Sequence, residues 1–142
     1  MSTYTPLSPI SVAFYAALNV AGLTALAPGG VHDDVPQNTT YPYVLFEVSE
    51  DQQLGGFGTL QGTKALPEIG WRVHVFTQGE GYKTAQAIAA KVLQLLATPP
   101  AVTGYGSWAI FHDTTIPLGD ELVAGVRVKE LVVTGRLYVE EA

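Results

Sequence analysis

The clearest pattern in the sequence is a strand followed by a helix, between residues 68 and 97. From Glu68 to Thr77 large apolar residues recur at every second position, which is typical of a strand with one face in the core. That face consists of Ile69, Trp71, Val73 and Val75. From Tyr82 apolar residues recur at steps of three and four, which predicts an amphipathic helix that ends before Pro99. We expect the other elements to complete a core around this unit.

A second helix is predicted close to the N-terminus. Ser8 can cap it and Pro9 suits its first position, while an apolar stripe runs from Ile10 to Leu18. Gly22 interrupts the stripe, and one more helical turn is expected before residues 28–30 end the unit. Residues 1–7 are expected to form an extended arm.

Three stretches predict strands outside the central unit. Residues 44–49 alternate in polarity, and residues 107–116 form a second candidate, followed by turn chemistry at residues 117–120. Residues 123–140 are apolar and β-branched, but this run is longer than most strands. Its apolar positions shift from even to odd numbers, so we expect a β-bulge or sharp bend at Lys129-Glu130.

Two further segments are irregular. Residues 31–37 predict a short extended piece, which Pro36 restricts to an edge or a loop. Residues 51–67 are rich in glycine and too long for a simple turn, so we interpret them as a long loop or irregular hairpin. Together the elements predict one domain over residues 1–142, an α+β fold with two helices on one face of a mostly antiparallel sheet.

Composition excludes several classes of function. The chain has 7 basic and 13 acidic residues, so its net charge of −6 offers no basic surface for gripping nucleic acid. It has no cysteine, which excludes disulfides and thiolate chemistry. No secretory signal is predicted, and no apolar run approaches the ~20 residues that span a bilayer. Only 14% of the residues are charged, which suits a surface partly buried against other subunits.

Candidate chemistry is weak. His32, Asp34 and His112 are the residues that a small metal-dependent hydrolase could use, but adjacent strand residues such as His112 and Asp113 point to opposite faces. The glycine cluster from Gly56 to Gly62 misses the dinucleotide-binding spacing. We therefore predict no catalytic residue, no metal and no cofactor, and a structural or binding role.

Two motifs and the central unit carry a resemblance to a known family. Residues 34–37 (Asp-Val-Pro-Gln), then residues 41–44 (Tyr-Pro-Tyr-Val), then the strand–helix unit of residues 69–97 resemble the tail terminator proteins, also called tail completion proteins, of long-tailed bacteriophages. The resemblance implies a twisted, mostly antiparallel sheet with helices on one side, and no enzymatic activity.

The resemblance also implies a role and partners. Members of this family form a hexameric ring at the head-proximal end of the tail tube, where the ring ends tube polymerisation and joins the tail to the head connector. The expected partners are therefore further copies of the chain, the tail tube protein and the head–tail connector, with genomic DNA passing through without specific binding. The expected location is the tail neck of the virion, after assembly in the host cytoplasm. Another neck or head–tail joining protein is the alternative.

On this reading, interaction surfaces are expected in the segment of residues 36–43, in the loop of residues 51–67 and in the C-terminal strand. Individual interaction residues are expected in the first two of these. They are Pro36, Gln37, Tyr41, Tyr43, Gly55, Gly56, Phe57 and Gly58.

Overall fold

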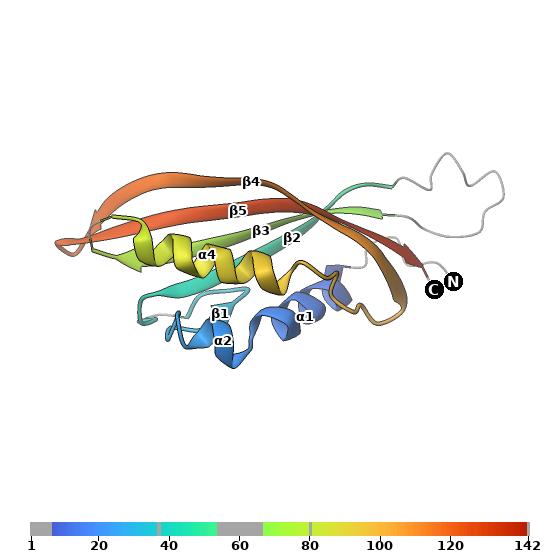
Figure 1. Ribbon diagram of the computed structural model, residues 1–142, viewed down its shortest axis with the longest axis horizontal. Coiled ribbons are helices and arrows are strands. Elements are labelled where there is room, and N and C mark those ends of the chain that lie inside the picture. The colour runs from blue at the N-terminus through green and yellow to red at the C-terminus, as the bar shows by residue number, and fades with distance from the viewer. Residues whose placement is uncertain (1–6, 37, 54–66, 80, 142) are drawn as a thin grey trace.

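A computed structural model of the protein describes residues 7–36, 38–53, 67–79 and 81–141. Within these residues the chain has a five-stranded sheet and three helices (Figure 1). The helices are α1 (Leu7–Leu18), α2 (Ala21–Thr24) and α4 (Lys83–Leu95). The strands are β1 (Val31–His32), β2 (Tyr43–Gln53), β3 (Pro67–Gln78), β4 (Tyr105–Val123) and β5 (Val126–Glu141). Their order across the sheet is β1-β2-β3-β5-β4, so β3 is central and β4 lies at one edge.

The predicted α+β class is confirmed, and the sheet is mixed. β2, β3, β5 and β4 pair in antiparallel fashion in that order. β1 instead pairs in parallel with β2, through Val31 opposite Val44. The residues of the expected arm, 1–6, lie outside the described part of the chain, as do residues 54–66 of the glycine-rich segment. Leu7, which we assigned to the arm, is the first residue of α1.

The central strand–helix unit is confirmed and supplies the middle of the core. Ile69, Trp71, Val73 and Val75 of β3 are all buried. Helix α4 packs onto them with its apolar face, because its buried residues lie three and four positions apart. These residues are Ala85, Ile88, Ala89 and Val92.

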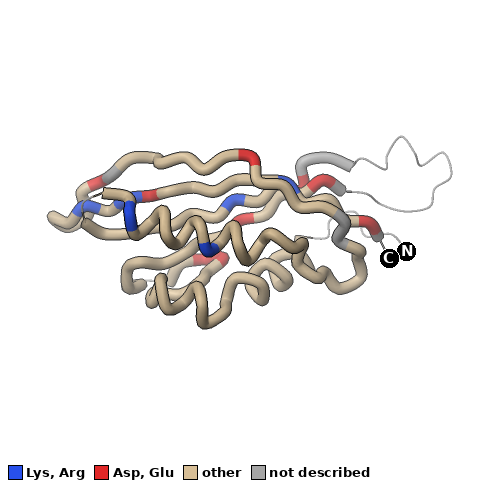
Figure 2. The backbone as a smooth tube through the Cα atoms, viewed as in Figure 1, with Lys and Arg blue, Asp and Glu red and all other residues tan. Residues whose placement is uncertain are grey.

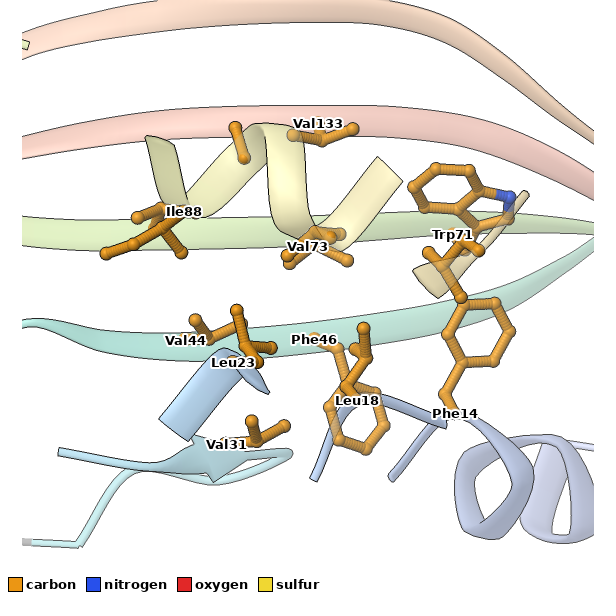
Figure 3. Packing of buried hydrophobic residues seen from close by; sticks show 14 of the residues in the cluster. Phe14, Leu18, Leu23, Val31, Val44, Phe46, Trp71, Val73, Ile88 and Val133 are labelled. Atoms are coloured by element: carbon orange, nitrogen blue, oxygen red, sulfur yellow. The ribbon is translucent and has the colours of Figure 1, made fainter. Parts of the chain in front are cut away.

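Helix α1 closes the core through an aromatic contact. The ring of Phe14 lies 6.1 Å from the ring of Trp71 and 6.4 Å from that of Phe46, between centroids (Figure 3). Such separations are favourable for aromatic pairs. Because Phe46 belongs to β2 and Trp71 to β3, a single side chain of α1 joins the helix to two strands.

Trp71 also accounts for the glycine at position 135 of β5. It lies opposite Gly135 in the register of the two strands. A Cβ atom on Gly135 would lie 2.2 Å from Cζ2 of Trp71 and 2.0 Å from the carbonyl oxygen of Phe111 in β4. The indole ring therefore occupies the space that a side chain at position 135 would fill.

Two expectations about the C-terminal strands are wrong. The turn does not lie at residues 117–120, which belong to β4, but at Ala124-Gly125. Both residues have positive φ, 51° and 80°, as a type I′ hairpin turn requires. The bulge expected at Lys129-Glu130 is also absent, because β5 pairs with β3 from Val128 to Tyr138 without a shift in register.

The shifts in register lie in β4 instead. They occur between residues 107 and 109, 112 and 114, and 117 and 119. The change of phase in β5 has another cause: Val126 and Val128 lie on the face opposite the core, and Lys129 occupies the core face. Lys129 is buried, and its Nζ atom lies 4.9 Å from the centre of the Tyr82 ring. A cation over an aromatic ring takes the place of an apolar contact here.

We expect Gly135→Ala to lower the free energy of unfolding by about 1–3 kcal/mol, because the added methyl group forces the Trp71 ring and the β4 backbone apart. Chemical denaturation followed by circular dichroism measures the change. Gly106→Ala in β4 is the matched control, since its Cβ atom would lie 3.9 Å from the Glu140 carbonyl oxygen, an ordinary contact. Equal losses of stability in the two variants would contradict the role of Gly135.

Candidate interaction surfaces

The sheet face opposite α1 and α4, which we call the outer face, carries linked polar and aromatic side chains. On β3 it presents Arg72, His74 and Phe76, which alternate with the buried residues of that strand. Their neighbours on β2 and β5 share this face because residues directly opposite in a sheet point to the same side.

An aromatic row begins at the predicted Tyr41-Pro42-Tyr43 segment. The ring centroids of Tyr41 and Tyr43 lie 5.2 Å apart, and Tyr43 stacks on Phe76 at 4.9 Å. Burial raises the pKa of the Tyr43 hydroxyl, with a smaller contribution from Tyr41. The structure thus brings two of the predicted interaction residues together on a half-buried aromatic surface at the start of β2.

A close backbone approach holds this segment in place. The amide of Gly29 donates to the carbonyl oxygen of Pro42 at 2.9 Å, and the amide of Val44 donates to that of Gly30 at 2.9 Å. A Cβ atom on Gly29 would lie 1.8 Å from the carbonyl oxygen of Thr40. The Gly29-Gly30 pair therefore ends the helical N-terminal part and lets residues 40–44 pass next to it.

His74 lies at the centre of a triad of polar side chains on the outer face, formed with Glu47 and Glu130. Its Nδ1 atom lies 2.5 Å from Oε2 of Glu130 on β5, and its Nε2 atom lies 2.5 Å from Oε1 of Glu47 on β2. Arg72 adds a further ion pair to Glu47, with 3.5 Å between Nε and Oε1. The imidazolium form, in which both ring nitrogens carry a hydrogen, donates to both carboxylates at once. The triad ties together three neighbouring strands.

This geometry does not suit a metal ion. The two carboxylates bind opposite nitrogens of one imidazole ring, so they lie on different sides of it and cannot share an ion with it. Within the described ranges, no group of three or more His, Asp or Glu side chains is arranged to hold a metal.

A second polar cluster surrounds Arg136 farther along the outer face. Its Nε and Nη2 atoms each lie 3.2 Å from carboxylate oxygens of Asp113, and its Nη1 atom donates to the hydroxyl of Tyr138 at 2.9 Å. Tyr138 in turn donates to Glu68 at 2.6 Å, and this hydrogen bond raises the pKa of the tyrosine. The guanidinium group also lies 5.5 Å from the centre of the Phe111 ring.

Carboxylates outnumber arginines on the outer face, where Glu47, Glu68, Asp113 and Glu130 face Arg72 and Arg136. Arg72 and Arg136 both bind carboxylates of the same face. A guanidinium that already binds a carboxylate attracts phosphate less strongly, so this surface offers a polyanion little attraction.

The remaining predicted interaction residues fall into two groups. Pro36 is exposed, and its carbonyl oxygen accepts a hydrogen bond of 2.6 Å from the hydroxyl of Thr39. Gln37 lies outside the described residues. So do Gly55, Gly56, Phe57 and Gly58, so a contact role for the glycine-rich segment stays a prediction.

Sequence reasoning missed the two polar clusters. His74 alternates with the apolar residues of its strand, but its partners Glu47 and Glu130 lie 27 and 56 residues away in the sequence. Only the register of three strands identifies them. A usable signal was present in each strand, since a charged residue stands at an outer-face position of all three.

The structure keeps the candidate hydrolase residues apart. His32 lies in β1, where its Nε2 atom is 2.7 Å from the carbonyl oxygen of Gly29. His112 lies in β4, where its Nε2 atom is 2.7 Å from the hydroxyl of Thr115. Because β1 and β4 are the first and last strands of the sheet order, His32 and Asp34 cannot converge with His112 on one substrate.

We expect the triad to contribute to stability near neutral pH and to lose this contribution in acid. The hydrogen bond from His74 lowers the pKa of Glu47 below its ordinary value of 4.5. A lowered pKa means that the folded state favours the carboxylate, so the contribution is present above pH 4.5 and lost as pH falls through the lowered pKa.

Denaturation of Glu47→Gln and of the wild type between pH 6 and pH 3 measures this contribution. The difference should be less than about 1 kcal/mol, because Glu47 is half-exposed, and should shrink as pH falls. Glu121→Gln, which removes an exposed carboxylate of β4, is the control. A Glu47→Gln difference that grows toward pH 3 would contradict the assignment.

Comparisons with known proteins agree with this fold. The family model described as "Tail completion protein gp17" matches residues 12–131. A chain in the structure titled "Virion of native gene transfer agent (GTA) particle" is 23% identical, with a TM-score of 0.72, over 91% of this chain and 92% of that one. The structure of the bacteriophage SPP1 gp17 protein is 20% identical, with a TM-score of 0.56, over 92% of this chain and 88% of that one. No curated protein matches the sequence.

The family match spans most of the chain and includes the central unit, the Tyr41–Tyr43 segment and the triad. The two structural matches support the same α+β fold. None of the described helices is long and apolar enough to cross a membrane. The chain belongs to the tail completion protein gp17 family, a family of structural proteins of phage tails.

Proposed function

We propose that the protein forms a ring at the head-proximal end of a phage tail tube, where it ends tube polymerisation and joins the tail to the head connector. The family match over residues 12–131 carries this proposal. The likeness to a chain of a gene transfer agent virion agrees with a place in an assembled particle. Within the particle, we propose the tail neck. The ring we propose is a homohexamer assembled in the host cytoplasm.

The proposed ring surrounds a channel through which genomic DNA passes. A protein of net charge −6 repels DNA rather than retaining it. The paired arginines of the outer face, Arg72 and Arg136, agree with such a role. The proposed role is structural, with no catalytic step, which fits a fold that keeps His32 and His112 at opposite edges of its sheet.

Loss of the protein should give tails of irregular, excessive length, because nothing then stops addition of tube subunits. The gene is deleted from the phage genome, and electron microscopy of the resulting lysate measures tail length and the fraction of tails joined to heads. The alternative, a neck protein that acts only in joining, predicts tails of normal length that are not attached to heads. Normal particles in normal numbers would contradict both functions.

Deletion of residues 55–62 should leave the fold intact and abolish binding to the tail tube protein. In the described part of the chain, β2 and β3 pair from Tyr43 opposite Phe76 to Gln53 opposite Pro67, and none of these pairs involves the deleted segment. Thermal unfolding and co-sedimentation with assembled tubes are the two measurements. A variant in which Gly and Ser replace residues 55–62 at equal length controls for shortening. Unfolding of the deletion variant, or unchanged tube binding, would contradict the proposed role of this segment.

A further inference from the structure

The edge strand β4 and the hairpin that follows it expose an unusual amount of apolar surface. Leu122 is 69% exposed and Leu118 is 59% exposed. Six of the nine large apolar side chains that are exposed in the described structure lie along this edge. Strand pairing places Leu122, opposite Arg127, on the helix side of the sheet and Ile116, opposite Val132, on the outer side. We call this edge, with side chains on both of its sides, the β4 flank. It consists of Phe111, Ile116, Leu118, Leu122, Val123 and Val126.

The other three exposed apolar side chains lie on α1 and in the turn after α2. They are Val12, Tyr15 and Leu26, and we call this surface the α1–α2 flank. No charged residue occurs between residues 7 and 31, so neither helix carries a charge (Figure 2). Val12 is nevertheless 67% exposed. Depletion of charge together with exposed apolar and aromatic side chains is typical of the centre of a protein interface.

The two flanks lie on opposite sides of the molecule. β4 runs along one side in Figure 1, whereas α1 and α2 lie beside β1 along the other. One copy therefore cannot bring its own flanks together, but the β4 flank of one copy can contact the α1–α2 flank of the next. A contact between two different surfaces repeats from copy to copy, and it gives a ring when the rotation closes.

The shape of β4 favours a partner that packs with side chains over one that adds a strand. Its register with β5 shifts at three places, and each shift makes the strand irregular. Bulges of this kind prevent continuous pairing with an added strand at a sheet edge. A helical surface such as the α1–α2 flank needs no backbone pairing.

Charge is complementary at one end of the two flanks. Beside α1 lies a groove of about 390 Å³, lined by Ser8, Ser11, Val12, Tyr15, Asp33 and Phe46. Among the described residues that line it, Asp33 alone is charged. At the end of the β4 flank, Leu122 lies opposite Arg127 in the hairpin, whereas Glu121, opposite Val128, lies on the other side of the hairpin. The side that carries Leu122 and Arg127 therefore offers an apolar side chain and a cation to a groove with an apolar wall and an anion.

We propose that the β4 flank of one copy packs on the α1–α2 flank of the next, with the β4–β5 hairpin in the α1 groove and Arg127 close to Asp33. The occupant is a second copy of this chain. The proposal rests on the proposed ring and specifies the contact from which that ring is built.

Cross-linking tests the contact directly, because the chain has no cysteine of its own. Val12→Cys is placed in one copy and Leu122→Cys in a tagged copy, and the mixture is treated with a short bismaleimide. We expect heterodimers in several-fold excess over a mixture in which Ala87→Cys, at an exposed position of α4, replaces Val12→Cys. The double variant should give a ladder of cross-linked species. Heterodimer yields equal to those of the control would overturn the proposal.

A charge exchange tests the orientation. Asp33→Arg in the Val12→Cys copy, or Arg127→Asp in the Leu122→Cys copy, should each lower the heterodimer yield several-fold. The two changes together should restore it, because the ion pair forms again with its charges exchanged. A heterodimer yield that falls in the single exchanges and is not restored in the double exchange would overturn the placement of the hairpin in the α1 groove.

Light scattering and negative-stain imaging of the wild type separate this proposal from the proposed ring. Rings without the Val12–Leu122 cross-link would overturn the contact and leave the ring standing. Cross-linked chains that remain open would support the contact and count against closure. Absence of both rings and cross-links at the highest soluble concentration would count against both.

Discussion

The packing of Trp71 against Gly135 is the constraint on which the rest of the structure depends. The indole occupies the space that a side chain at position 135 would need, and Phe14 packs against it from α1. The Trp71 ring of β3 therefore lies over β5, and its contact with Phe14 anchors the N-terminal helix to the sheet. Because protein interiors are packed at near-crystalline density, the displacement caused by one added methyl group at position 135 affects three strands, β3, β4 and β5.

The fixed sheet gives its two faces different properties. One face is filled by the apolar side chains of β3, α4 and α1. On the outer face, His74 joins carboxylates from two flanking strands, and Arg136 joins Asp113 to Tyr138. These clusters hold neighbouring strands together across their register and neutralise the arginines. A surface with an excess of carboxylates and with paired arginines agrees with the DNA channel that we propose.

The edges of the sheet account for the apolar surface that the core leaves exposed. β4 extends beyond α4 and ends in a hairpin with Leu122 and Val123 in solvent, while α1 and α2 present a surface without charge. A monomer gains nothing from either surface. In the ring that we propose, each copy would cover one flank of its neighbour, and the low charge of the sequence and the long edge strand would have the same explanation.

The sequence by itself determined the elements whose signal is local. Periodicity placed β3 and α4, and the Pro-Gln and Tyr-Pro-Tyr motifs indicated the family. Ser8-Pro9 predicted the first helix, but α1 begins at Leu7, so Ser8 lies within the helix and does not precede it as a cap. Only the tertiary structure decided the Ala124-Gly125 turn, the bulges in β4, the parallel pairing of β1 and the partners of His74. The turn was missed because Ala124 adopts positive φ, which favours other residues, whereas Pro117-Leu118-Gly119-Asp120 has common turn chemistry. The other features depend on strand register, and register arises from contacts between residues that are far apart in the chain.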